Sequence, residues 1–313
     1  MDAAGFSGLA LEVFRFQFRN NPVYRDFCNL LGKDPDRVND LDQVPYLPIG
    51  LFKTREVTTG SFRPELVFES SGTTQTVNSR HLVRDASLYE ESFLTCFTSF
   101  YGPVTDWCIL GLLPSYLERG HSSLVYMVNR LVEDSRHPDS GFYLYDFSRL
   151  HDTLLRLDGQ KVMLIGVTFA LLDFAAQFPQ PLHNVVVMET GGMKGRKKEL
   201  VRQQVHALLR QAFGLSAIHS EYGMTELLSQ AYAGEKGLFR CPPWMQIRIR
   251  DDEDPLTVHA IGTGGINVID LANVYSCSFL ATDDAGTVHP GGHFEVLGRI
   301  DNSDLRGCSL MAL

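Results

Sequence analysis

The sequence has no long uninterrupted hydrophobic run and no basic stretch ahead of its first apolar residues. Its most apolar segment, VMLIGVTFALLDFAAQF (162–178), is interrupted by Gly166 and carries Asp173. A transmembrane helix needs about 20 consecutive apolar residues, so a buried strand followed by a helix explains this segment better. The N-terminal MDAAGFSGLALEVF lacks the basic region of a signal peptide. Both absences argue against a membrane span and a signal peptide.

Positive charge is also scarce. The 313 residues include 28 basic and 37 acidic side chains, a formal net charge of −9. Proteins that bind nucleic acid present a basic face to its phosphates, so we expect no nucleic-acid partner. A short basic run, RKK at 196–198, could contact phosphate groups, but such a run is more often a solvated helix face.

Cysteine pairs with metal-binding or disulfide spacing are missing. The six cysteines show no CxxC pattern, and the sequence contains neither HExxH nor GxSxG. There is therefore no sequence signal for a zinc site or a disulfide framework. Free thiols in a reducing compartment are the simplest explanation, and we expect a cytoplasmic protein. The cysteines lie at positions 28, 96, 108, 241, 277 and 308.

What is present, from about residue 85, is an alternation of helix-like and strand-like segments. The helix-like stretches include DASLYEESFLTCFTSF (85–100) and GRKKELVRQQVHALLRQAF (195–213). The strand-like runs include WCILGLL (107–113), FYLYDF (142–147) and KVMLIGV (161–167). This alternation predicts an α/β fold with a parallel or mixed sheet covered by helices on both faces.

The pattern differs at the two ends of the chain. Residues 1–43 are amphipathic and predict a helical segment, and Pro45 and Pro48 then predict an extended connector. After about residue 238, short alternating runs separated by Gly, Pro and Asp predict a smaller antiparallel β subdomain. We therefore expect an N-terminal helical segment at 1–43, an α/β core at 44–237 and a β-rich subdomain at 238–313.

The first candidate site is the run SSGTT, which follows the strand-like ELVFE (65–69). Backbone amides of a tight turn can surround phosphate oxygens, Gly72 permits close approach, and hydroxyl groups add donors without charge. The run is not a P-loop, because GxxxxGK[ST] is absent, and an ordinary polar turn explains it equally well. HLVRD (81–85) also fits the weak HxxxD pattern of some acyltransferases. The residues of the run are Ser70, Ser71, Gly72, Thr73 and Thr74.

The second candidate site is EYGMTE (221–226), between the strand-like LSAIHS and the helix-like LLSQAYA (227–233). Ligands of α/β proteins bind at such strand-to-helix junctions. Tyr222 could stack on a flat ring, while Thr225 and Glu226 could serve a phosphate and Mg²⁺. The alternative is a helix cap with an acidic capping residue.

The third candidate site combines ATDDAG (281–286) with GRID (298–301). Asp284 could bind both hydroxyl groups of a ribose, and Arg299 could neutralise a phosphate or a developing charge. The alternative is a β-hairpin with exposed charges.

Taken in order, SSGTT, YGMTE, TDDAG and GRID resemble the phosphate loop, central motif, TGD motif and hinge motif of the adenylate-forming superfamily, which includes acyl-CoA synthetases and firefly luciferase. VPYLPIGLFK, LPSYLERGHSSLVYM and METGGMKGRKKEL most resemble the acyl-protein synthetases of bacterial luminescence operons, with phenylacetate-CoA ligases next. The resemblance covers about residues 44–307. It implies a fold like the large N-terminal domain of adenylate-forming enzymes.

The resemblance also implies a reaction in which a fatty or aryl carboxylic acid attacks the α-phosphate of ATP, giving an acyl-adenylate and pyrophosphate. Ser70 to Thr74 would hold the β- and γ-phosphates, Thr225 would contact the α-phosphate, and Glu226 would hold Mg²⁺. The remaining positions would be Gly191, Gly192, Tyr222 and Gly223 at adenine, Asp284 at ribose, Arg299 at ribose or phosphate, and Asp301 at the hinge.

Two features depart from the pattern of the superfamily. Its phosphate loop usually continues to a lysine, whereas QTVNSR follows here, and Arg80 could replace that charge. Most members also continue past the hinge for roughly a hundred residues, the size of a small domain, which carries a catalytic lysine. This sequence ends at Leu313, so we expect neither the usual domain rotation nor that lysine.

Cys308 lies five residues before the end of the sequence. The luminescence synthetases pass the acyl group to a cysteine near the C-terminus, so the resemblance implies that the Cys308 thiolate is the nucleophile and that an acyl-accepting partner protein follows. An inert tail cysteine is the alternative. Transfer to CoA or to a carrier-protein thiol, and a relative that binds a nucleotide or acyl-adenylate without turnover, are the competing hypotheses.

Overall fold

The computed structural model describes most of the chain as two compact units. Among the described residues, no helix is both long and apolar enough to cross a membrane. The described ranges are 3–70, 77–113, 121–191, 200–234 and 236–300. The first unit consists of Met1–Tyr89, Thr225–Ser229 and Arg240–Leu313. The second unit consists of Glu90–Met224 and Gln230–Phe239.

The second unit contains a mostly parallel sheet. Its strands are Cys108–Leu112 (β4), Gly141–Phe142 (β5), Val162–Val167 (β6), Val185–Thr190 (β7), His219–Tyr222 (β8) and Ala231–Ala233 (β9). They lie in the order β9-β8-β7-β6-β4-β5, and only the β8–β9 pair is antiparallel. Every residue of β4 and β6 is buried, as expected for central parallel strands covered on both faces.

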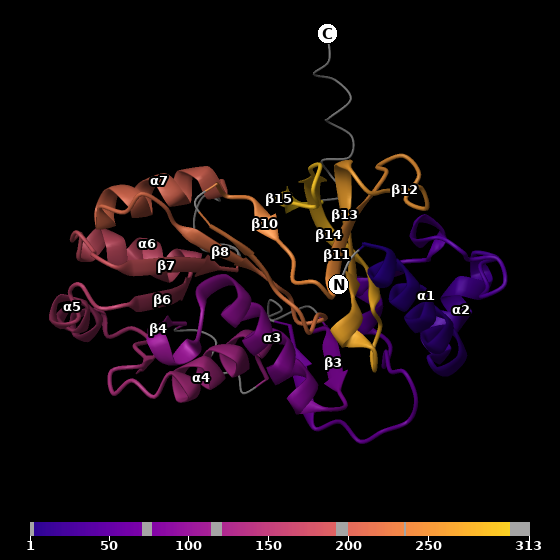
Figure 1. The fold of residues 1–313 in the computed structure, drawn as a ribbon, viewed down its shortest axis with the longest axis horizontal. Helices are drawn as coiled ribbons and strands as arrows, with labels where there is room; N and C mark the ends of the chain where they lie inside the picture. The colour runs from indigo at the N-terminus through magenta and orange to yellow at the C-terminus, as the bar shows by residue number, and fades with distance from the viewer. Residues whose placement is uncertain (1–2, 71–76, 114–120, 192–199, 235, 301–313) are drawn as a thin grey trace, which may run out of the picture. The chain divides into compact units, whose positions relative to one another are not determined.

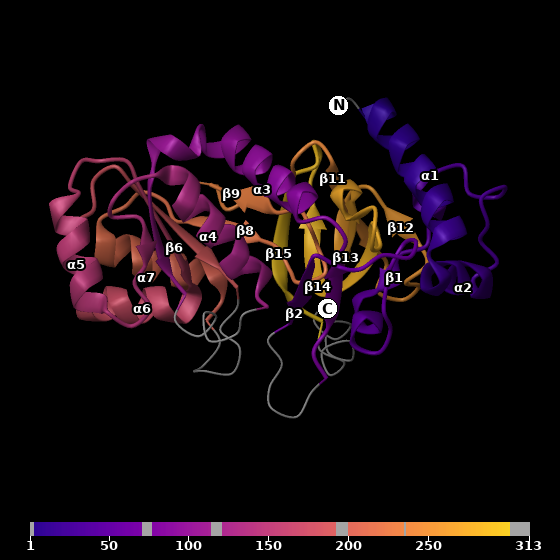
Figure 2. The same cartoon turned by 90° about the horizontal axis from the view of Figure 1, so that it is seen from below.

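Helices cover both faces of this sheet. Figures 1 and 2 show α4 on one face and α6 and α7 on the other, because right-handed crossovers that run in opposite directions from the centre place their helices on opposite faces. Helix α3 begins in the first unit and continues into the second. The helices are Ala86–Tyr101 (α3), Ser123–Ser135 (α4), Phe147–Arg156 (α5), Thr168–Gln177 (α6) and Arg202–Phe213 (α7), with a 3₁₀ turn at Val104–Asp106 (η3).

The first unit is built on an antiparallel sheet. Its main strands are Met245–Arg250 (β11), Val258–His259 (β12), Gly262–Asp270 (β13), Phe279–Val288 (β14) and Phe294–Arg299 (β15). They lie in the order β12-β11-β13-β14-β15. The short strand Leu47–Pro48 (β1) pairs in parallel with β14. The two-residue strand Phe239–Arg240 (β10) lies at the boundary of the two units.

Smaller elements complete the first unit. Strands Leu66–Glu69 (β2) and Arg80–Val83 (β3) form a separate antiparallel pair. The N-terminal helices are Ala3–Asn20 (α1) and Pro22–Leu30 (α2). Three 3₁₀ turns lie at Leu41–Gln43 (η1), Ile49–Lys53 (η2) and Leu271–Asn273 (η4).

A buried glutamine on helix α1 forms hydrogen bonds with the segment between β13 and β14. The side chain of Gln17 is fully buried; its Nε2 donates to the carbonyl of Val274 at 2.9 Å, and its Oε1 accepts from the amide of Ser278 at 3.0 Å. Nearby, the rings of Phe14 and Tyr24 pack around Phe279, with Tyr24 stacked on it at 6.0 Å. Apolar packing therefore holds the helix, and Gln17 determines its position along the segment.

The predicted fold class is confirmed: mixed α/β sheet covered by helices, with a smaller antiparallel β region. Three local predictions are wrong. The helix expected at 227–233 is absent, because the amides of Leu228 and Ser229 bind the side chain of Asp270 and Ala231–Ala233 pairs with β8.

The other two errors concern FYLYDF and the proline-containing connector. In FYLYDF, only Phe142 belongs to a strand, because Leu144 has φ 49° and Asp146 caps α5 by accepting from the amide of Arg149 at 3.0 Å. The connector is not simply extended, since it forms β1 and then the turn η2.

We expect Gln17→Leu to destabilise the protein by about 3 kcal/mol, because it leaves buried main-chain groups without partners. The free energy of unfolding, measured by urea titration, checks this. Asn20→Ala is the matched control on the same helix: the Nδ2 of Asn20 donates to the carbonyl of Phe16 on an exposed surface, so its loss should change stability by less than about 0.5 kcal/mol. Equal effects of the two variants would contradict the role of Gln17.

Candidate active site

The segment YGMTE passes from the second unit to the first between Met224 and Thr225. Its second half belongs to a turn, Thr225–Ser229, that contains no helix or strand. Main-chain groups of a buried turn need hydrogen-bond partners, since an unpaired one lowers stability. Side chains from distant parts of the first unit supply these partners.

Two side chains hold consecutive carbonyl groups of the turn. The Nδ1 of His81, on β3, lies 2.8 Å from the carbonyl oxygen of Thr225. The Nδ2 of Asn273, at the end of η4, donates to the carbonyl of Glu226 at 2.7 Å. His81 is 1% exposed and Asn273 is fully buried. Burial lowers the pKa of His81 to about 4, although the bond to Thr225 raises it in part, so the ring is neutral near pH 7.

The following residues of the turn are held by one buried carboxylate. Asp270 accepts hydrogen bonds from the amides of Leu228 at 2.8 Å and Ser229 at 3.0 Å, from the hydroxyl of Ser229 at 2.6 Å, and from the amide of Ala272 at 3.1 Å. Burial raises the pKa of Asp270 above its ordinary value, while these donors lower it. Trp244 donates from Nε1 to the hydroxyl of Ser229 at 3.1 Å.

The first half of YGMTE lies in the second unit, at the end of β8. Tyr222 is 8% exposed, and its ring lies 5.9 Å from that of Phe239. A Cβ at Gly223 would overlap the Oε1 of Glu221, so any larger residue there would require the Glu221 side chain to shift. Thr190 hydrogen-bonds to the other carboxylate oxygen of Glu221. Burial, together with the charge of Glu189, raises the pKa of Glu221 to about 7, although the hydrogen bond with Thr190 lowers it in part.

Gly191 follows β7 in the same unit and has φ 70°, a left-handed conformation suited to glycine. Its carbonyl lies 2.7 Å from the hydroxyl of Thr168, which also lies 2.8 Å from the Oε2 of Glu189. Ser220 donates to the Oε1 of Glu189 at 3.0 Å, and the Nε2 of His206 lies 3.5 Å from that oxygen. A buried polar network therefore determines where the main chain leaves β7.

Strands β2 and β3 form the base of the SSGTT loop. Glu69 pairs with Arg80 in the ladder, the amide of Ser70 donates to the carbonyl of Ser79 at 3.0 Å, and the amide of Ser79 donates to the hydroxyl of Ser70 at 2.9 Å. Arg80 is 52% exposed and lies 3.9 Å from both Glu69 and Glu56. Ser71, Gly72, Thr73 and Thr74 lie outside the described residues, as does Gly192.

Asp284 and Arg299 are directly opposite each other on β14 and β15. The amide of Asp284 donates to the hydroxyl of Thr282, two residues earlier on β14, at 3.1 Å. Arg299 is exposed and pairs with Asp283 at 3.3 Å. Asp301 and Cys308 lie outside the described residues.

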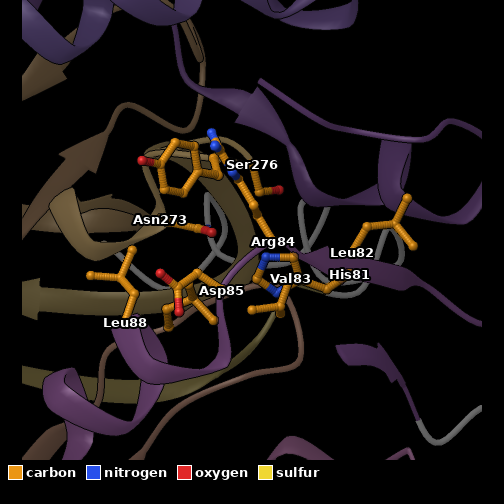
Figure 3. A pocket seen from close by; sticks show the side chains of 10 residues that line it. His81, Leu82, Val83, Arg84, Asp85, Leu88, Asn273 and Ser276 are labelled. Carbon is orange, nitrogen blue, oxygen red and sulfur yellow. The ribbon is translucent and has the colours of Figure 1, made fainter. Parts of the chain in front are cut away.

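A small pocket, partly open to solvent, lies beside His81 and Asn273. Figure 3 shows both side chains together with Arg84 and Asp85. The guanidinium of Arg84 lies 4.3 Å from the centre of the Tyr275 ring, a distance typical of cation–π contacts. The other lining residues are Leu82, Val83, Leu88, Leu228 and Ser276.

The structure thus places β3, which leads out of the SSGTT loop, against the Thr225–Glu226 half of the central motif. His81, Asn273 and Asp270 make this arrangement, and the sequence did not identify their role. His81 was considered only within the weak HxxxD pattern. Among the described residues, no group of three or more His, Cys, Asp or Glu side chains could hold a metal ion.

Comparisons with known sequences identify relatives of this chain. The model of the acyl-protein synthetase family LuxE matches residues 148–312. The long-chain-fatty-acid–luciferin-component ligase of Vibrio harveyi is 25% identical over 97% of this chain and 86% of its own length. The ligase of the same name from Photorhabdus luminescens is 35% identical over 21% of this chain and 56% of its own length.

Solved structures show the same fold at low sequence identity. 2-Hydroxyisobutyryl-CoA ligase, in complex with 2-HIB-AMP and CoA, is 13% identical with a TM-score of 0.70, covering 96% of this chain and 75% of its own. ATP-bound MatB from Rhodopseudomonas palustris is 17% identical with a TM-score of 0.58 over 76% of this chain. This chain spans about half, 49%, of the length of the MatB chain. The fold is therefore that of adenylate-forming enzymes.

The family match extends over more than half of the 313 residues and includes YGMTE, TDDAG and GRID. The resemblance inferred from these motifs is confirmed, and the chain belongs to the LuxE family of acyl-protein synthetases.

Proposed function

We propose that this protein uses ATP to activate a long-chain fatty acid and then transfers the acyl group to a thiol. In the first step a carboxylate oxygen bonds to the α-phosphorus of ATP, and pyrophosphate leaves. In the second step a thiolate attacks the acyl carbon, a thioester forms, and AMP leaves. Family membership supports the reaction type, and the names of the Vibrio and Photorhabdus relatives support a long-chain acid.

The observation that carries this proposal is the fixed main chain at Thr225 and Glu226. Both carbonyl groups are held by buried side chains, so the two residues are oriented before any substrate binds. We assign the Thr225 hydroxyl to the α-phosphate and the Glu226 carboxylate to Mg²⁺. A lone carboxylate suits this ion, which usually takes its other ligands from phosphate oxygens and water. When bound, Mg²⁺ would neutralise phosphate charge.

The other nucleotide contacts are assigned by position in the family motifs. Asp284 would bind the ribose hydroxyls, with Arg299 near ribose or phosphate. Gly191, Gly192, Tyr222 and Gly223 would surround adenine. The network of Thr168 and Glu189 supports this assignment for Gly191, because it fixes the carbonyl at that position.

The acceptor thiol is proposed to be Cys308, from which a partner protein would receive the acyl group. Acyl transfer requires a thiolate, and burial raises the pKa of Cys28 and Cys96 to about 12 and of Cys108 to about 11. Burial also raises the pKa of Cys277 well above its ordinary value. Burial therefore disfavours the thiolate form at these four cysteines, whereas Cys241 is free and partly exposed. CoA or a carrier-protein thiol is the second candidate acceptor, and CoA in the complex of 2-hydroxyisobutyryl-CoA ligase favours it.

We expect ATP–pyrophosphate exchange that depends on a carboxylic acid, highest with long-chain fatty acids in a panel that includes short-chain and aryl acids. Glu226→Gln should lower the exchange rate by about 100-fold or more, because it removes the charge assigned to Mg²⁺. Glu56→Gln, at an exposed carboxylate, is the control and should leave the rate unchanged. Absence of exchange with every acid would favour a relative that binds without turnover.

When the protein is incubated with labelled fatty acid and ATP, without CoA, we expect the label to become attached to the protein through a thioester. Cys308→Ala should abolish this label while exchange continues, because adenylation precedes transfer. Cys108→Ala serves as the control for loss of a buried thiol and should keep the label. Label retained on the Cys308→Ala variant would exclude Cys308 as the acceptor.

Arg80→Ala should raise the KM for ATP by less than about 5-fold, the effect expected for an exposed charge. The reason is that Arg80 is already half exposed and paired with Glu69 and Glu56, so we assign phosphate binding to loop amides, hydroxyl groups and Mg²⁺. A larger rise in KM that Arg80→Lys reverses would show that Arg80 replaces the usual lysine.

A further inference from the structure

The hydrogen bond between His81 and Thr225 determines where the proton of the imidazole ring lies. A carbonyl oxygen can only accept, so Nδ1 must carry the hydrogen of the 2.8 Å bond. In the neutral ring Nε2 is then an acceptor. A second proton on Nε2 is opposed by burial, which lowers the pKa of His81 to about 4.

Asn273 has a similar arrangement. Its Nδ2 donates to the carbonyl of Glu226 at 2.7 Å and to the carbonyl of Cys277 at 3.0 Å, so Oδ1 is left as an acceptor. The Oδ1 of Asn273 and the Nε2 of His81 are both buried, and among the described residues neither makes a well-formed hydrogen bond, although the Asn273 side chain lies close enough to the ring to raise the pKa of His81. Both side chains line the same pocket (Figure 3).

The two bonded carbonyls lie on either side of one α-carbon. The Thr225 carbonyl belongs to the peptide plane before Glu226, and the Glu226 carbonyl belongs to the plane after it. Because peptide units are planar, the orientations of two successive planes define φ and ψ of the residue between them. Holding both carbonyls therefore fixes the direction in which the Glu226 side chain leaves the main chain.

We propose that His81 and Asn273 are positioning residues that together clamp the main chain on both sides of Glu226 and so aim its carboxylate. This inference rests on the proposed function, in which Glu226 holds Mg²⁺. Neither residue contacts a reacting atom in this role. His81 acts through its Nδ1–H donor alone, and proton transfer at Nε2 has no part in it.

The test compares two substitutions of His81. His81→Asn keeps an N–H donor near the position of Nδ1 and removes Nε2. His81→Phe keeps a flat buried ring but removes both nitrogen atoms, Nδ1 and Nε2. We expect His81→Phe to lower kcat of ATP–pyrophosphate exchange by about 10- to 100-fold, as for a misaligned catalytic group, with a smaller change in KM for ATP. His81→Asn should stay within about 5-fold of wild type, because one hydrogen bond is retained.

Ser276→Ala is the matched control. Ser276 lines the same pocket and is 2% exposed, and its hydroxyl donates to the carbonyl of Val57 at 2.9 Å. Like His81→Phe, this variant loses one buried hydrogen bond to a main-chain carbonyl. That carbonyl belongs to Val57 and not to the Thr225–Ser229 turn. It should lower the midpoint of thermal unfolding and leave kcat unchanged. If Ser276→Ala lowers kcat as much as His81→Phe does, the effect is general destabilisation and the proposal fails.

Two measurements on the protein do not need activity. Amide hydrogen–deuterium exchange in the peptide covering residues 223–230 should speed up in His81→Phe and stay as in wild type in His81→Asn. ¹⁵N spectra of the wild-type protein labelled at histidine should show His81 protonated at Nδ1 and not at Nε2. The opposite tautomer, or equal impairment of His81→Asn and His81→Phe, would overturn the clamp. Wild-type protein without exchange activity would overturn the proposed function, and these two measurements would still decide the clamp.

Discussion

The candidate site depends on the hydrogen bonds between buried side chains and the main chain of Thr225–Ser229. A turn without helix or strand cannot satisfy its own amides and carbonyls. Here His81 and Asn273 hold two carbonyls, and Asp270 binds two amides and a hydroxyl. Each partner is itself buried, so removing one would leave an unpaired group away from water, which is more damaging than losing a surface bond. The turn therefore has one shape.

The N-terminal helix contributes to the same arrangement from the other side of the segment 273–278. Gln17 binds the carbonyl of Val274, and Asn21 donates to the carbonyl of Ser276 at 2.9 Å. The side chain of Asn273 then extends from this segment to Glu226. Gln17 on α1 and Asn21, the N-cap of α2, are both buried, and together they hold the segment from which Asn273 extends.

Sequence periodicity predicted the architecture well, because each helix and strand carries its own pattern. Strands β4 and β6 are continuous apolar runs, and both were identified. Hydrogen bonds between distant residues were not predictable: His81 and Thr225 are separated by 144 positions, and no local pattern marks the pair. The same cause explains the wrong helix at 227–233, since helix-compatible residues there bind Asp270 instead of one another. Motif order identified the family, whereas the supporting side chains required coordinates.

Charge is distributed differently in the interior and at the surface of the candidate site. The buried carboxylates of Asp270 and Glu189 are satisfied by amides and hydroxyl groups. Two arginines of the candidate motifs, Arg80 and Arg299, are exposed and pair with carboxylates at 3.9 and 3.3 Å. Exposed ion pairs contribute roughly 0–1 kcal/mol, so these pairs add little to the stability of the protein. In each unit, buried hydrogen bonds fix the main chain, whereas the exposed arginines make only weak ion pairs.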